Sequence, residues 1–223
     1  MTCRLATVMR MIGIGSVMAY RLSTRRLSTG TFLKQVIETQ GLDHVRALDM
    51  FCCRGTMTRE IRDIVRRECP SQSFEIEGID EDPKNINHAR NASTQITFRC
   101  GDITLPSSAP VPGLRIDGFD WFVFQHCEDR IRSEYVGFMM DRLTARTRYY
   151  PNPRSVCLIY RSSTSMTDAR IRRQCRMYCT NPYDIFSSVV SRTTDTDTDH
   201  EHLTAVIIHP DPSLDEEDVL AVA

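Results

Sequence analysis

Short apolar runs alternate with amphipathic stretches along most of the chain. Runs such as "VRALDMF" at 45–51 and "FEIEGID" at 74–80 have the length of buried strands. By contrast, "TMTREIRDIVRREC" at 56–69 places its apolar residues at helical spacing. Because parallel strands are joined through crossover helices, this alternation predicts an α/β fold with helices on both faces of a mostly parallel sheet.

The same pattern extends through the chain and predicts seven strands. The strands are expected at 45–51, 74–80, 96–102, 119–125, 155–162, 184–193 and 203–209, and the helices at 31–42, 56–69, 82–92, 132–147 and 167–178. Thr31 can cap the first helix and Gly41 can end it. The last two strands lack a helix between them, so we expect a hairpin that leaves one strand antiparallel at the sheet edge.

The length of 223 residues suits one domain with a full core. We expect a basic leader or lid at 1–30, the folded domain at 31–210 and an acidic tail at 211–223. The first 37 residues hold six basic residues and no acid. We expect them to form a helical lid in a cytoplasmic protein; the alternative is a mitochondrial transit peptide, for which such an arginine- and serine-rich composition is typical. The apolar run at 11–20 is too short to span a membrane.

Charge and cysteine usage narrow the classes of partner. A net charge of −1 gives no general attraction for nucleic acid, which makes a nucleic-acid partner unlikely. Nine cysteines without CxxC spacing favour free thiols in a reducing compartment. The polar run "DTDTDHEH" at 195–202 lacks the spacing of a calcium or zinc site and is expected in the hairpin loop, so no metal site is predicted.

Acidic residues close several of the predicted strands. Asp49, Asp80 and Asp102 each stand at the end of a strand, and "QHCE" at 125–128 follows the fourth. In open α/β sheets ligands bind at these carboxyl ends, where a carboxylate can accept hydrogen bonds from two ribose hydroxyls. Each acid alone is more commonly a cap or turn residue, but the ordered set favours a nucleoside ligand that carries positive charge.

These segments resemble class I S-adenosylmethionine-dependent methyltransferases over about Thr31 to Pro210. "ALDMFCCRGTMT" is similar to that family's first motif, D-x-G-x-G-x-G, and "IEGIDEDPKNINHAR" to the segment that follows it. "ITFRCGDI" is similar to its adenine-binding motif, and "FDWFVFQHCEDR" to the fourth-strand segment of its small-molecule branch. The resemblance implies a Rossmann-like three-layer sandwich whose mostly parallel seven-stranded sheet ends in an antiparallel C-terminal hairpin.

The resemblance also implies S-adenosylmethionine as cofactor. Asp80 would bind the ribose, Asp102 the adenine amine, and Asp49 with the following turn the methionyl end. The implied cofactor-binding residues are Asp49, Phe51, Cys53, Gly55, Asp80, Glu81, Asp102, Ile103 and Gln125. His126 could act as a general base or simply pack on the cofactor.

The chain departs from the motif at two of its three glycines. Phe51 replaces the first glycine and Cys53 the central one. Where the backbone needs positive φ, a side chain costs about 1–2 kcal/mol. A cost of this size corresponds to roughly a tenfold loss of affinity.

A small organic molecule entering over "QHCEDR" is the expected methyl acceptor. Three alternatives stay open: a catalytically inactive methyltransferase-like binding protein, an RNA or protein methyltransferase, and a nicotinamide-dependent enzyme. Cys53 motivates the first, and Phe51 with the arginine-rich leader motivates the second. The glycine-poor turn argues against the third.

Overall fold

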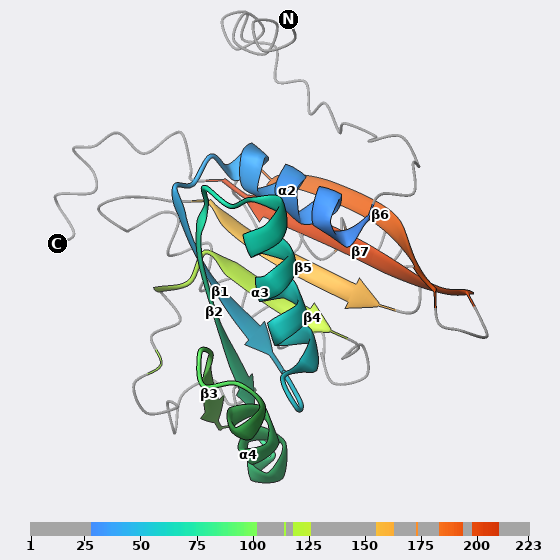
Figure 1. Cartoon of the computed structure of the whole chain (residues 1–223). Helices are drawn as coiled ribbons and strands as arrows, with labels where there is room; N and C mark the ends of the chain where they lie inside the picture. The colour runs from blue at the N-terminus through green and yellow to red at the C-terminus, as the bar shows by residue number, and fades with distance from the viewer. Residues whose placement is uncertain are drawn as a thin grey trace, which may run out of the picture.

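The structure is a computed structural model that describes residues 28–101, 114, 118–125, 155–162, 173, 183–193 and 198–209 (Figure 1). In chain order its elements are α2 (Thr29–Gln40), β1 (His44–Met50), α3 (Thr56–Glu68), β2 (Ser73–Asp80), α4 (Pro83–Ala92), β3 (Thr97–Cys100), β4 (Trp121–Gln125), β5 (Val156–Ser162), β6 (Tyr183–Thr193) and β7 (Thr198–Ile208). The predicted tail at 211–223 and most of the leader and of the helices at 132–147 and 167–178 lie outside these residues.

The strands of the described residues form one seven-stranded sheet, as predicted, and their order in it is β3-β2-β1-β4-β5-β7-β6. The strands from β3 to β5 are parallel, and β7 is antiparallel to both of its neighbours. The hydrophobic pattern alone placed the antiparallel strand at the sheet edge, and this was wrong, because β7 lies between β5 and β6 and the edge strand is β6. The inserted antiparallel seventh strand that the family resemblance implies is confirmed. Residues Leu203 to Ile208 of β7 are all buried, which suits a position with a strand on each side.

One apolar core lies between the sheet and the helices on one of its faces (Figure 1). The buried positions of α2 and α3 follow helical spacing and pack on the strands: Phe32, Leu33, Val36 and Ile37 from α2, and Ile61, Ile64 and Val65 from α3. The predicted cap of α2 was wrong, because the Ser28 side chain accepts from the Thr31 N–H. Gly41 ends the helix at φ 62°, as predicted.

The C-terminal hairpin has a shorter loop than the sequence predicted. Pairing of β6 with β7 continues to Thr193 opposite Thr198, so part of the polar run at 195–202 is strand. The β5 pairing stops at Ser162 opposite His202, and the two strands run on beyond the rest of the sheet as a ribbon (Figure 1). Backbone hydrogen bonds alone sustain such a ladder, so polar residues do not end it.

The described residues contain no helix long and apolar enough to cross a membrane. Over the same ranges, no group of three or more His, Cys, Asp or Glu residues is placed to hold a metal ion.

The short strand β3 pairs with β2, and the ring of Phe98 packs it against the rest of the fold. A Cβ added at Gly78 of β2 would lie 2.7 Å from this ring, and one added at Gly55 would lie 2.6 Å from it. Gly55 precedes α3, so Phe98 packs β3 against both the sheet and the turn that leads into the helix. Glycine at 55 and 78 is therefore a packing requirement.

Gly55→Ala should destabilise the protein much more than Gly41→Ala. Both glycines have positive φ, 69° and 62°, so the backbone cost of about 1 kcal/mol is shared. Only at Gly55 does the new methyl group meet Phe98, since nothing lies within 4 Å at Gly41. We expect about 1–3 kcal/mol of additional loss at Gly55, measured by denaturant unfolding. Equal losses would contradict the packing role of Phe98.

Candidate functional site

The turn between β1 and α3 has a left-handed backbone at every second residue. Phe51 has φ 60°, Cys53 has φ 49° and Gly55 has φ 69°. These are the three positions at which the motif D-x-G-x-G-x-G has glycine. Non-glycine residues in this region cost on the order of 1–3 kcal/mol each and persist only where the surroundings fix them.

Hydrogen bonds to the end of β2 fix this turn. The Cys52 N–H donates to the Ile79 carbonyl at 2.9 Å, and the Cys53 N–H donates to Asp80 Oδ2 at 2.9 Å. The Gly55 N–H closes the turn on the Cys52 carbonyl at 2.9 Å. The turn is therefore attached to β2 through both backbone and side-chain acceptors.

Asp80 is the last residue of β2, at the carboxyl end of the strand, and its side chain accepts hydrogen bonds from three residues. Besides the Cys53 N–H, it accepts at Oδ1 from the Asp82 N–H at 3.0 Å and from Asn85 Nδ2 at 3.2 Å. The side chain is only 2% exposed. A carboxylate offers about four acceptor sites, so these three donors leave room for one more. Glu81, the next predicted site residue, is exposed.

The two non-glycine residues of the turn differ in burial. Phe51 is 7% exposed, and burying such a ring stabilises the fold by about 1.5–3 kcal/mol, which offsets its backbone strain. Cys53 is exposed, so burial supplies no such compensation. The hydrogen bond from the Cys53 N–H to Asp80 helps to hold this strained backbone in place.

A buried polar cluster lies at the carboxyl ends of β1 and β4. Asp49 is fully buried, and its Oδ2 accepts from Thr58 Oγ1 at 2.6 Å and from Gln125 Nε2 at 2.9 Å. Asp49 Oδ1 and Gln125 Oε1 are buried and have no hydrogen-bond partner among the described residues. Burial raises the pKa of Asp49 to about 6, against the opposing effect of the two hydrogen bonds.

A buried arginine lies at the end of β5 near this cluster. Arg161 is 4% exposed, and its Nη1 lies 3.5 Å from Glu60 Oε2 and 3.5 Å from Met57 Sδ, both on α3. Its charge acts on Asp49 in the direction that lowers the pKa, but less than burial raises it. The sequence analysis missed Arg161 and Thr58. The available signal was an arginine within the apolar run of β5, whereas a threonine in an ordinary helix gives none.

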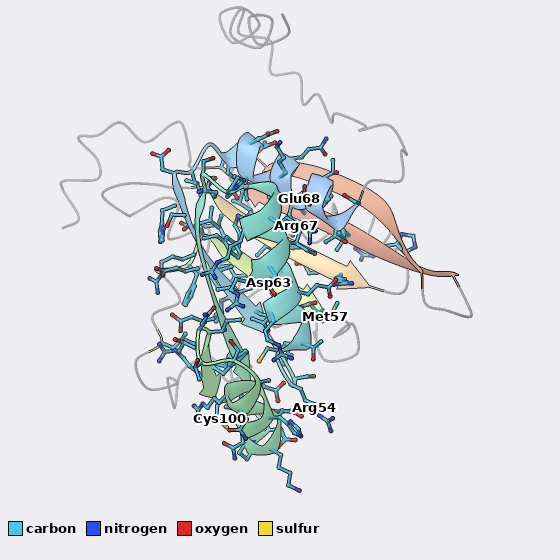
Figure 2. All side chains as sticks on the ribbon, in the orientation of Figure 1. Arg54, Met57, Asp63, Arg67, Glu68 and Cys100 are labelled. Carbon is cyan, nitrogen blue, oxygen red and sulfur yellow. The ribbon has the colours of Figure 1, made fainter. Side chains whose placement is uncertain are left out.

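The first turn of α3 faces the turn after β1 and can attract an anion. Its N-cap, Gly55, provides no side-chain hydrogen bond, and the first turn has no acidic residue. Free N–H groups and the helix dipole make such an end favourable for a carboxylate or phosphate. Figure 2 shows Met57 at this end of the helix and Arg67 and Glu68 at the other. Arg54, also missed from the sequence, is an exposed cation of the turn.

Most of the residues predicted to bind the cofactor lie at or just after the carboxyl ends of the parallel strands. Asp49 ends β1, Asp80 and Glu81 follow β2, Gln125 ends β4, and the residues of the turn lie between β1 and α3. The Gly101 N–H donates to the Asp80 carbonyl at 3.0 Å, so the chain after β3 also reaches this edge. Asp102, Ile103 and His126 lie outside the described residues.

No protein-family model and no curated protein matches the chain. The plantazolicin methyltransferase BpumL, solved with SAH, matches with 12% identity over 82% of each chain and a TM-score of 0.53. The plantazolicin methyltransferase BamL, solved with a triazolic desmethylPZN analog and SAH, matches with 10% identity over 80% of this chain and 82% of its own, at a TM-score of 0.54.

The CMeT domain of a citrinin polyketide synthase matches with 14% identity and a TM-score of 0.52, over 82% of this chain and 52% of its own. Similarity at these identities is informative about the fold. With the strand order and the left-handed turn, it confirms the resemblance at that level: the chain has the Rossmann-like fold of class I S-adenosylmethionine-dependent methyltransferases.

Proposed function

We propose that the protein is an S-adenosylmethionine-dependent methyltransferase that acts on a small organic acceptor. The observation that carries this proposal is the backbone of the turn after β1. Its three alternate residues are left-handed, although two of them, Phe51 and Cys53, are poorly suited to that conformation. Phe51 and Cys53 adopt the left-handed conformation in spite of its energetic cost. This indicates that the function of the turn requires this backbone path.

The residues around the turn fit the charges of this cofactor. Asp49 Oδ1 and Gln125 Oε1 are buried acceptors to which no described residue donates, and a ligand with a positive charge would supply the missing attraction. The start of α3 suits the cofactor's carboxylate. Asp80 has one acceptor site left for a ribose hydroxyl. Asp102 with Ile103 would hold the adenine.

When bound, S-adenosylmethionine supplies a methyl group already activated on a sulfonium. The protein then has to hold the acceptor in line with that methyl group, which accounts for much of the rate of such a transfer. Gln125 ends β4 among these residues, and His126, which follows it in the sequence, would accept the proton from acceptors that lose one.

Two observations support a small acceptor. The neighbours with TM-scores above 0.5 include enzymes named for plantazolicin and for a citrinin polyketide synthase. The net charge of −1 provides no general attraction for nucleic acid.

One observation favours a second candidate, a methyltransferase fold that binds a partner without catalysis. Cys53 is exposed at the central motif position, where a cofactor would approach the backbone. A side chain there narrows the space over the turn.

Calorimetric titration with S-adenosylmethionine distinguishes the two candidates. We expect micromolar binding by the wild type and about tenfold tighter binding by Cys53→Gly, since glycine relieves both the strain and the crowding. Cys69→Ser, at the far end of α3, should leave the affinity unchanged and serves as control. If neither the wild type nor Cys53→Gly binds while circular dichroism shows an intact fold, the enzyme proposal is wrong. Binding by Cys53→Gly alone would favour the inactive candidate.

Asp49→Asn should stabilise the protein and weaken cofactor binding. The ordinary pKa of 3.8 rises to about 6 on folding, so the folded state favours the protonated acid. Its contribution to the free energy of unfolding is therefore greatest below pH 4, declines as the pH rises to about 6, and stays lower above that. Asparagine cannot ionise, so we expect about 1–3 kcal/mol of stabilisation at pH 7.5 by denaturant unfolding.

In the same variant, affinity for S-adenosylmethionine should fall at least about tenfold, because the charge that attracts a cation is gone. In the wild type, affinity should rise between pH 5 and pH 7 as Asp49 ionises around its pKa of about 6. A destabilised Asp49→Asn with unchanged, pH-independent affinity would show that Asp49 is purely structural.

A further inference from the structure

The edge strand β6 offers a long backbone surface for pairing. It has eleven residues, Tyr183–Thr193, and every one is paired with β7 on its inner side. Within the described residues β7 is its only neighbour in the sheet. The opposite edge is β3, which has four residues.

The sequence of β6 carries few of the features that protect exposed edges. Natural edges are commonly kept short or are interrupted by proline, lysine or a bulge. The strand "YDIFSSVVSRT" contains no proline, glycine or lysine, and its pairing with β7 runs through all eleven residues without a break. Such an edge is suited to accept another strand.

The same sequence is self-complementary about its central residue. Asp184 and Arg192, the only charged residues of β6, lie four positions on either side of Ser188. In an antiparallel pair of two copies centred on Ser188, Asp184 of one copy would stand opposite Arg192 of the other, twice. Phe186 would stand opposite Val190, and all eleven residues would overlap.

We propose that the protein forms a two-fold symmetric dimer in which the β6 strands of two copies pair antiparallel and join the two sheets into one. The occupant of the edge is thus a second copy of this chain. A two-fold axis requires that each contact be repeated with the roles exchanged, and the Asp184 to Arg192 spacing meets that condition.

The register within the chain supports this assignment. In the register of β6 with β7, the residue opposite Asp184 is the apolar Ile207. Arg192 is opposite Asp199, and a partner's Asp184 on its other side would give an alternating row of charges across the interface. The ribbon that β6 and β7 form beyond β5 lengthens the contact (Figure 1).

Charge reversal tests the register directly on the full chain. In sedimentation velocity at micromolar concentration, the wild type should be a dimer. Asp184→Arg and Arg192→Asp each set like charges opposite one another in a homodimer, so each variant should dissociate at least about tenfold more readily. An equimolar mixture of the two variants should dimerise again, because every facing pair is then of opposite charge.

Thr97→Arg adds a charge to the opposite edge of the sheet and should leave the dimer intact. Recovery in the mixture also shows that the single variants had folded, which circular dichroism checks independently. A monomeric wild type would overturn the proposal and leave the edge to another segment of the chain or a different partner. Dimers that persist in both single variants, or a mixture that stays monomeric, would overturn it as well.

Discussion

The hydrogen bond from the Cys53 N–H to Asp80 is the contact on which the candidate site depends. It holds a strained backbone in place at the point where β1 passes into α3. The same carboxylate accepts from the Asp82 N–H and from Asn85 Nδ2, so it also holds the start of α4 against the end of β2. One buried side chain thereby positions the turn, the start of the next helix and the acceptor site available to a ribose.

The buried carboxyl group of Asp49 lies near the turn, at a position where an apolar side chain would make the fold more stable. Asp49 is fully buried with a raised pKa, and one of its oxygens has no partner within the described part of the chain. The buried Arg161 near it balances part of this charge. Groups of this kind cost stability and are characteristic of sites that bind or react. Phe51 and Cys53 thus occupy two glycine positions of the motif, and the turn that they form lies next to a buried cluster that carries ionisable groups.

The sequence predicted the strands well, because their apolar runs are bounded by turns and separated by helical patterns. It also located Asp49, Asp80 and Gln125 at the sheet edge, since the carboxyl ends of parallel strands lie together. It failed where long-range pairing decides the outcome. The inner position of β7 and the shortened hairpin loop depend on which strand finds two partners, and local pattern does not record that. The roles of Thr58 and Arg161 were likewise visible only after packing.

A crystal structure of the protein with S-adenosylhomocysteine would test the central claim most directly. We expect the turn to keep positive φ at residues 51, 53 and 55 and a ribose hydroxyl to lie within hydrogen-bond distance of Asp80. The methionyl ammonium should face Asp49 and Gln125. A turn that abandons the left-handed conformation, or a ligand bound away from this edge of the sheet, would contradict it.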